Sequence, residues 1–283
     1  MDKQKHTHSY LHGLILAGLT LMLLRLVVND SLTYYLSPTM HPYLYASIIV
    51  LGLLSVIQLA APNANHMSCD DCDHHHMPTK GLPALVFYCL FLFPIISGFT
   101  FPDHALGSDV AADRQMRRSA SSSLSGNASQ SQTGQNGRAD RQPISQNQFD
   151  RLKHDMLHRQ KLTIEPKNYT YMMTIIEQNL DHLKGKEVTL TGFVYRDKQT
   201  TSSEFIAARF VITCCIADAS VYGMPVRGDV GHFNKDRWVE VSGTLNAAIR
   251  DGKKVPIVDA KQVTSIPQPK HPYVYDNGVN LNK

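Results

Sequence analysis

The stretches 43–61, YLYASIIVLGLLSVIQLAA, and 82–101, LPALVFYCLFLFPIISGFTF, decide the architecture of this chain. Neither contains a charged residue, and each approaches the ~20 apolar residues that a helix needs to cross the hydrocarbon core of a bilayer. A third stretch, Tyr10–Val28, has a similar length and carries Arg25 near its end. The sequence therefore predicts three N-terminal transmembrane helices within residues 1–103.

The first apolar stretch also has some features of a secretory signal peptide. Lys3 and Lys5 precede it, as basic residues do in such peptides. No small-residue cleavage site precedes Asn29, however, and Arg25 interrupts the apolar run. We therefore expect an uncleaved span, in which the long side chain of Arg25 reaches toward the membrane interface.

The distribution of basic residues predicts the orientation of the chain in the membrane. The connection 29–42 contains no Lys or Arg and carries Asp30, which favours the outer side. Three spans then place the amino terminus and the connection 62–81 inside, and the remainder of the chain outside. We expect a multi-pass protein of the cell membrane with an extracytoplasmic C-terminal domain.

Residues 104–148 are predicted to be a flexible linker. Within them, Ser119–Gly137 consists almost entirely of small and polar residues. Such a composition buries too little apolar surface to offset the entropy of ordering the chain, so we expect disorder there.

Residues 149–283 form the predicted soluble domain. Apolar residues in Tyr169–Leu183 recur at helical spacing, and Gly185 follows as a C-cap. Beyond it the period changes to two, which indicates strands. The predicted strands are Val188–Val194, Phe205–Ile216, Val221–Val226, Trp238–Leu245 and Val255–Ile266. The fold class is thus α+β: three membrane helices, a disordered linker and a mainly-β domain with one preceding helix. Five strands so spaced fit an OB-like small barrel, with a β-sandwich or another mixed sheet as the alternative.

The connection 62–81 is rich in residues that ligate metals. Its C-x-x-C spacing lets both sulfurs reach one ion across a turn, and neighbouring imidazoles can complete a tetrahedral set. Thiolate and imidazole ligands suit zinc or another transition metal better than magnesium or calcium. The candidate ligands are His66, Cys69, Cys72, His74, His75 and His76. The alternatives are a polar loop that is merely His-rich, and a thioredoxin-like redox motif, for which the strand–motif–helix context is missing.

A second candidate site lies at the end of the second predicted strand, where Cys214 and Cys215 are followed by Asp218. Neighbouring side chains of a strand point to opposite faces, so we expect one thiol to be buried and the other to face the surface or a pocket. Three interpretations stay open: a core cysteine beside an inert neighbour, a vicinal disulfide, or thiolate ligands to a metal near Asp218.

Catalytic motifs are missing from the sequence, which contains no G-x-S-x-G, no phosphate-binding glycine loop and no H-E-x-x-H. We therefore do not expect an enzyme, although a thiol oxidoreductase that uses Cys214 and Cys215 is an alternative. The net charge of +4 is too weak to argue for nucleic acid. An oligonucleotide-binding barrel would need exposed aromatic platforms; the aromatic residues of the strands are Tyr195, Phe205, Phe210 and Trp238.

Several motifs distributed along the chain resemble the YcgQ-like family of bacterial membrane proteins. They are Leu36-Ser-Pro38-Thr-Met40, the His-rich loop, Gly98-Phe-Thr-Phe-Pro102, Gly192-Phe-Val-Tyr-Arg196, and Ala208-Arg-Phe210 followed by Cys214-Cys-Ile-Ala-Asp-Ala219. The resemblance implies one subunit of a two-component permease, working beside a separate multi-spanning permease subunit encoded nearby, with transport related to metals.

The expected function is therefore an accessory subunit of a membrane permease complex that handles a metal ion or a metal-related solute. Three spans without a central ionisable residue are too few for a typical transport pathway, which favours a partner. The expected partners are the permease subunit and membrane lipid, without nucleic acid. The alternative is a membrane-bound sensor of metal or envelope stress that transports nothing.

Overall fold

The computed structural model describes residues 2–60, 82–100, 105–113, 146–197, 200–250 and 252–275. The chain divides into two units, of which the first comprises Met1–Tyr35 and Met40–His104. The second comprises Leu36–Thr39 and Ala105–Lys283. A short piece of the connection between the first two helices therefore belongs to the C-terminal unit.

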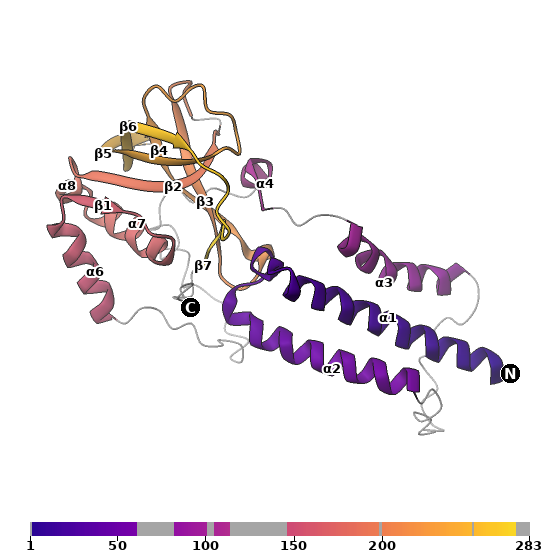
Figure 1. Ribbon diagram of the computed structural model, residues 1–283. Helices are drawn as coiled ribbons and strands as arrows, with labels where there is room; N and C mark the ends of the chain where they lie inside the picture. Colours follow the sequence, from indigo (N-terminus) through magenta and orange to yellow (C-terminus); the bar gives the residue numbers. More distant parts are fainter. Residues whose placement is uncertain are drawn as a thin grey trace. The chain divides into compact units, whose positions relative to one another are not determined.

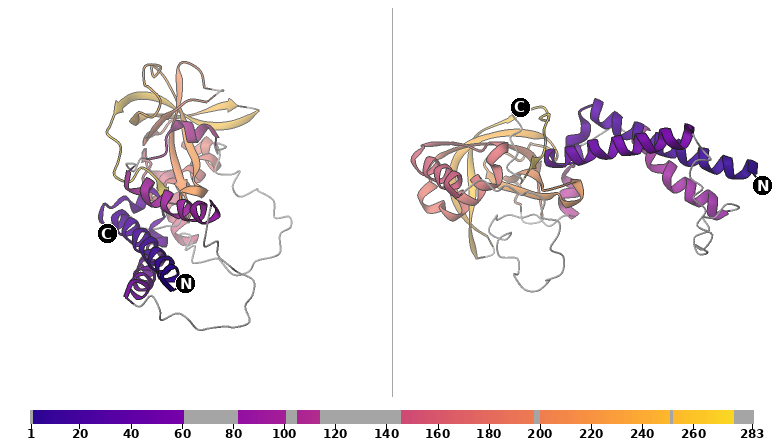
Figure 2. Two further views of the ribbon diagram at one scale, coloured as in Figure 1. Left: turned by 90° about the vertical axis from the view of Figure 1, so that its right-hand side faces the viewer. Right: turned by 90° about the horizontal axis from the view of Figure 1, so that it is seen from below.

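The first unit contains three apolar helices, α1 (Asp2–Val28), α2 (His41–Ala60) and α3 (Leu82–Thr100). Figures 1 and 2 show α1 and α2 lying side by side, and α1 also contacts α3. Among the described residues, the stretches Tyr10–Val28 and Pro38–Ala60 are long and apolar enough to cross a membrane. The apolar stretch measured in α3, Tyr88–Thr100, is shorter.

Small residues bring the helices of the first unit close together. A Cβ added to Gly13 would lie 3.0 Å from the side chain of Leu59, and one added to Gly98 would lie 2.7 Å from Cε of Met22. Interfaces between membrane helices are enriched in such residues because the helix backbones can then approach closely. The side chain of Arg25 donates a hydrogen bond to the carbonyl of Gly98, so it joins α1 to the last turn of α3.

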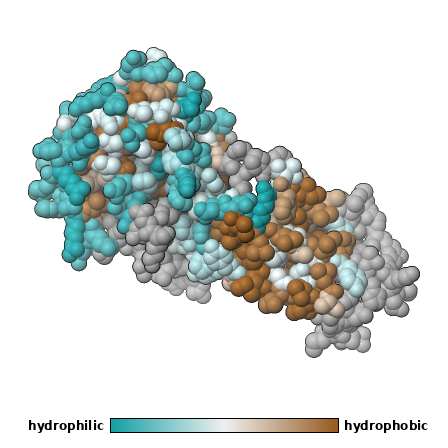
Figure 3. Space-filling model, viewed as in Figure 1, coloured by the Kyte–Doolittle hydropathy of each residue, from teal (hydrophilic) through white to brown (hydrophobic). Residues whose placement is uncertain are grey.

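Apolar side chains cover much of the outer surface of these helices, as Figure 3 shows in brown. Leu14, Ile49 and Val56 each leave more than 60% of their surface exposed. Helices that are hydrophobic all round are typical of membrane spans. The surface of the β-domain in the same view is mainly hydrophilic.

The second unit is built around a closed β-barrel. Its strands are β1 (Lys161–Thr163), β2 (Glu187–Tyr195), β3 (Glu204–Ile212), β4 (Ser220–Arg227), β5 (Trp238–Arg250), β6 (Lys253–Ser265) and β7 (Val274–Tyr275). The order is β1-β2-β5-β6-β4-β3-β7, and an additional pairing of β2 with β3 closes the ring. The β4–β6 pair is parallel, whereas the other pairs of the ring are antiparallel. All five predicted strands are thus present, but β3 ends at Ile212 rather than at Ile216.

Gly192 allows the ring to close. A Cβ at this position would lie 2.8 Å from the backbone oxygen of Ala208 and 2.9 Å from the carbonyl carbon of Ala207. No real Cβ tolerates such contacts, so only glycine lets β3 approach β2 here. Past this point the two strands separate, because β2 continues along β5.

Three helices cover the domain: α6 (Gln146–His158), α7 (Tyr169–Gln178) and α8 (Leu180–Leu183). The predicted helix Tyr169–Leu183 is therefore interrupted at Asn179, whose side-chain amide donates to the carbonyl of Ile175. Ile175, Ile176 and Leu183 are fully buried and join the apolar core formed with the strands. The period of the apolar residues predicted this packing face correctly.

Two parts of the predicted linker 104–148 are helical: the beginning of α6, and α4 (Ser108–Asp113). The amide and the hydroxyl of Ser108 both donate to the carboxylate of Asp236, and the amide of Leu106 donates to the hydroxyl of Tyr273. A composition-based prediction cannot show such long-range anchors, because their partners follow more than a hundred residues later. The predicted disorder of Ser119–Gly137 lies outside the described residues.

Candidate functional site

The loop between β3 and β4 holds the candidate thiol site, and Asp218 organises it. The carboxylate of Asp218 accepts hydrogen bonds from the backbone amides of Thr213 (2.9 Å), Cys214 (2.7 Å) and Cys215 (3.3 Å). Ile216–Asp218 forms a single 3₁₀ turn, η4, capped reciprocally by the side chains of Cys215 and Asp218. This turn ends the strand and fixes the backbone that carries the two cysteines.

The two sulfurs lie together rather than on opposite faces. The Sγ atoms of Cys214 and Cys215 are 3.7 Å apart, and both side chains are partly exposed. The expectation of one buried and one exposed thiol is therefore wrong. The reason is that β3 ends at Ile212, so the alternation of a strand no longer applies to these residues.

Two of the three interpretations of this cysteine pair do not fit the geometry. Partial exposure contradicts a core cysteine, and a separation of 3.7 Å is far from the ~2.05 Å of a disulfide bond. One ligand atom each from Cys214, Cys215 and Asp218 lie within 4.8 Å of one another, an arrangement that could hold a metal ion. The interpretation as metal ligands is compatible with this geometry and stays a prediction.

The electrostatics of the site couple the thiols to the carboxylate. A hydrogen bond to Asp218 is the main reason why the pKa of Cys214 is raised to about 12, with burial and Cys215 adding to the effect. Burial alone would raise the pKa of Asp218, but the hydrogen bonds from Cys214 and from three backbone amides outweigh it and lower that pKa. The carboxylate is thus ionised at neutral pH, and Cys214 is a protonated thiol.

The segment Leu36–Thr39 borders the thiol loop. The amide of Ser37 donates to the carbonyl of Cys214 at 3.0 Å, and Leu36 forms an antiparallel bridge with Cys215. Ser37 is fully buried, and its hydroxyl lies 3.1 Å from that of Thr39. Sequence reasoning missed this contact; the only signal was Pro38, which favours an extended conformation at the preceding residue.

A buried arginine occupies the seam where β2 and β3 separate. Arg209 is 2% exposed, and it donates from Nε to the carbonyl of Thr191 and from Nη2 to the hydroxyl of that residue. Its guanidinium lies 5.2 Å from the ring centroid of Trp238. Burial lowers the pKa of Arg209 and raises that of nearby Tyr169 to about 12. The side chain satisfies a strand edge that β3 no longer covers.

The aromatic residues considered for nucleic-acid stacking are inside the domain. Tyr195, Phe205, Phe210 and Trp238 are each 8% exposed or less. Their rings pack on other parts of the barrel, as in the stacked pair of Phe193 and Phe210 with centroids 5.4 Å apart. They offer no open face to a base.

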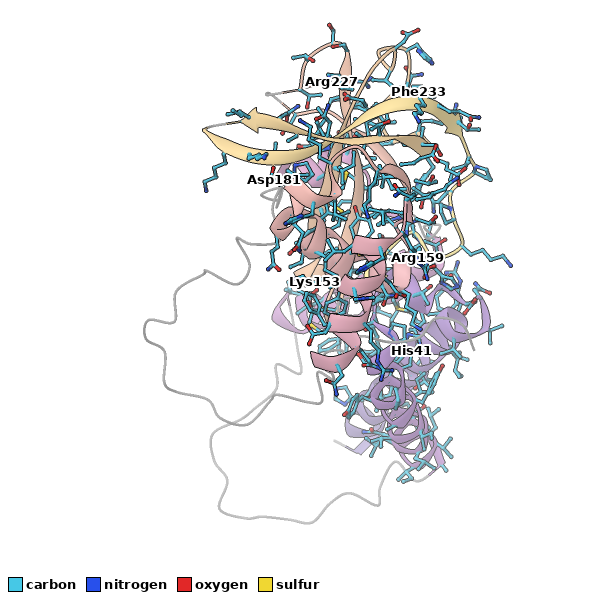
Figure 4. The ribbon with its side chains drawn as sticks, turned by 90° about the vertical axis from the view of Figure 1, so that its left-hand side faces the viewer. His41, Lys153, Arg159, Asp181, Arg227 and Phe233 are labelled. Carbon is cyan, nitrogen blue, oxygen red and sulfur yellow. The ribbon has the colours of Figure 1, made fainter. Side chains whose placement is uncertain are left out.

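Two ion pairs link strands of the barrel. Arg227, labelled in Figure 4 at the end of β4, forms an ion pair with Asp259, and Arg250 forms one with Glu204. Lys153 and Arg159 project from α6 and its end. The predicted ligands His66, Cys69, Cys72, His74, His75 and His76 lie outside the described residues, so the structure brings only Cys214, Cys215 and Asp218 together.

The fold and the site define a class: an apolar helical N-terminal part joined to a β-barrel domain that carries a thiol pair. Two models of one family match the chain, the DUF1980 N-terminal domain over residues 11–117 and the DUF1980 C-terminal domain over residues 140–276. The chain belongs to this family, which confirms the resemblance to YcgQ.

The chain is similar to two bacterial proteins that carry names. A Streptococcus mutans protein, named as a candidate subunit of a two-component membrane permease complex, is 38% identical over 117 residues, which are 41% of this chain and 43% of that protein. The UPF0703 protein YcgQ of Bacillus subtilis is 26% identical over 93% of this chain and 98% of its own length. The chain thus matches less than half of the first relative. No solved structure matches.

Proposed function

We propose that this chain is an accessory subunit of a two-component membrane permease complex. The name of the Streptococcus mutans relative supports this proposal, because this chain and that relative are 38% identical over the 117 residues that they share. The composition of the apolar helices supports it as well: Arg25 is the one charged residue in the spans 10–28, 43–61 and 82–101. Transport pathways through membranes are usually marked by such residues, so a partner supplies the pathway.

The anchor of this subunit has three spans. This inference rests on one observation: Leu36–Thr39 and Ala105 belong to the same unit of the structure. The chain leaves that unit, passes through the twenty residues of α2, and returns to it after the nineteen residues of α3. A helix of twenty residues is ~30 Å long, enough to cross the hydrocarbon core. If α2 crosses the membrane, α3 crosses back.

The same path supports an assignment of the two sides of the membrane. The connection that contains Leu36–Thr39 lacks Lys and Arg and therefore favours the outer side. The β-domain shares that side, and the Cys/His-rich connection 62–81 lies in the cytoplasm. There its thiolates and imidazoles are suited to bind zinc or another transition metal.

The β-domain is an OB-like barrel. Five strands that close through β2 and β3, with one parallel pair between β4 and β6, match a Greek-key barrel of this type. Within the complex, this domain binds the solute at the outer face of the membrane. Recognition of nucleic acid does not fit, because the candidate stacking residues are buried.

The native cysteines test the topology directly. In intact cells, a membrane-impermeant maleimide should label the partly exposed Cys215, whereas Cys69 and Cys72 should react only after permeabilisation. Peptide mass spectrometry identifies the labelled residues. The reverse pattern contradicts the proposed sidedness.

Affinity purification of the full chain from its own membrane tests the complex. We expect a multi-spanning partner, and loss of transport after the Cys/His-rich connection is deleted. A chain that purifies without any such partner contradicts the permease proposal. A deletion that alters signalling but leaves transport unchanged would favour the sensor alternative.

A further inference from the structure

We propose that Cys214, Cys215 and Asp218 form a site for a thiophilic divalent cation of the zinc class, and that a bound cation stabilises the pairing of the thiol loop with Leu36 and Ser37. This proposal does not rest on the permease assignment. It concerns a site in the β-domain, separate from the Cys/His-rich connection 62–81.

The spacing of the sulfurs fits such an ion. Two thiolates bound at ~2.3 Å to a tetrahedral ion lie ~3.8 Å apart. The observed distance between the Sγ atoms of Cys214 and Cys215 is 3.7 Å. The pair therefore needs almost no rearrangement to hold an ion between its sulfurs.

The carboxylate of Asp218 supplies a third ligand. Its ligand atom lies within 4.8 Å of both sulfurs, so a small movement brings it into the coordination sphere. An ionised carboxylate offers about four lone-pair positions. The amides of Thr213, Cys214 and Cys215 use three of them, and the thiol of Cys214 uses the fourth. The thiol vacates that position when it gives up its proton and binds the ion through sulfur.

The site is open on one side. Cys214 and Cys215 are partly exposed and Asp218 is exposed. Closed structural zinc sites use four protein ligands, whereas sites with three protein ligands keep a fourth position for water or another ligand. A cation held by Cys214, Cys215 and Asp218 would therefore keep one position for a ligand from solvent.

Binding exchanges two thiol protons for one cation. The two S–H bonds break, two metal–sulfur bonds form, and both protons pass to solvent. The groups that face Cys214 electrostatically are Asp218 and Cys215, and Leu36–Thr39 carries no ionisable side chain. The negative charge of the Asp218 carboxylate attracts the cation to the two sulfurs.

The backbone links this site to Leu36–Thr39. The carbonyl of Cys214 accepts the hydrogen bond from Ser37, and Cys215 pairs with Leu36. An ion that joins both side chains also restrains the peptide between them. Opening of the pairing then requires release of the ion, so occupancy slows that opening.

Cobalt titration of the full chain in detergent tests the site. The background variant C69S/C72S removes the thiols of the other candidate site, and a thiolate-to-cobalt charge-transfer band reports sulfur ligands alone. We expect one equivalent of Co²⁺ to bind through two thiolates, and Zn²⁺ to displace it. Adding Cys214→Ser or Cys215→Ser should remove at least half of the band.

Matched controls keep the result interpretable. Cys89→Ser removes a thiol of α3 and should leave the band unchanged. Fluorescence of Trp238, the single tryptophan, reports whether each variant keeps its barrel. A folded C69S/C72S protein without a thiolate band overturns the site, whether or not a permease partner is found.

Hydrogen exchange tests the coupling. With zinc at ten times its Kd, exchange of the Ser37 amide should slow about 11-fold if opening requires release of the ion. Unchanged exchange at saturating zinc overturns the coupling. The variant C214S/C215S should show no zinc effect.

Discussion

The amide of Ser37 donates a hydrogen bond to the carbonyl oxygen of Cys214 across 3.0 Å, which joins the connection between α1 and α2 to the end of β3. Two motifs that are far apart in the sequence thus form one structural element. Two elements restrain the chain around the thiol pair. The turn η4 follows it in the sequence, and Leu36–Thr39 lies beside it.

Replacing Ser37 with proline should loosen the thiol loop. Proline lacks the amide hydrogen that reaches Cys214, and the loss of a buried hydrogen bond costs about 1–3 kcal/mol. Alkylation of Cys214 and Cys215 by iodoacetamide should become faster. Ser37→Ala keeps the amide and serves as the control. Equal alkylation rates for both variants and the native chain would show that this bond does not restrain the loop.

Asp218→Asn should make Cys214 a stronger acid. The hydrogen-bonded carboxylate is the main cause of the raised pKa of about 12, so removal of its charge lowers the pKa of Cys214 toward the ordinary value for a thiol. The rate of alkylation against pH should shift to lower pH. A profile that stays in place would contradict the assigned role of Asp218.

The same carboxylate makes the loop sensitive to acid. The pKa of Asp218 in the folded chain is lowered, so its contribution to stability is present above the ordinary aspartate value and is lost as pH falls through the lowered pKa. Exchange of the amides of Thr213 and Cys214 should accelerate in that acidic range. In Asp218→Asn the acceleration should be absent.

Arg209 should tolerate methionine better than lysine. Methionine removes both the buried charge and the bonds to Thr191, whereas lysine keeps a buried charge with fewer donors. We expect Arg209→Lys to lower the free energy of unfolding by about 3–5 kcal/mol and Arg209→Met by about 1–3 kcal/mol. Denaturant unfolding followed by Trp238 fluorescence measures both. A lysine variant as stable as the native chain would contradict the account of the seam.

Lys186 stabilises the end of α6. Its Nζ donates to the carbonyls of Met156, Leu157 and Arg159, which have no partner within the helix. Lys186→Ala should lower the free energy of unfolding by about 1–2 kcal/mol. Exposed Lys184, in the same connection, provides the control, and Lys184→Ala should change stability by less than about 0.5 kcal/mol. Equal effects of the two variants would rule out the capping role.

The strand β2 was predictable from sequence because it begins with an alternation of buried and more exposed residues, as Val188 and Leu190 alternate with Thr189. The strand β3 is buried along its whole length, and its sequence signal was a run of apolar residues instead. Closure of the ring could not be predicted from the sequence, because it depends on Gly192 lying against the backbone of Ala208. This is a contact between separate strands. The thiol pair was visible in the sequence. The arrangement of the two thiols could not be predicted, because Asp218 ends the strand early by accepting backbone hydrogen bonds. The spacing of apolar residues carries no information about these bonds.

The helix α4 and the strand β1 also escaped prediction, and both did so for the same reason. Each is short, and each is held by residues far along the chain, as Ser108 is held by Asp236. Local propensity carries little information about such elements, since their stability comes from tertiary contacts.

Strand β7, at Val274–Tyr275, pairs with Val211 and Ile212 of β3 close to the C-terminal end of the chain. Leu36, near its beginning, pairs with Cys215. Val274 and Tyr275 leave the ribosome long after Leu36 does. The β-domain therefore completes these pairings only after all three apolar helices have been synthesised.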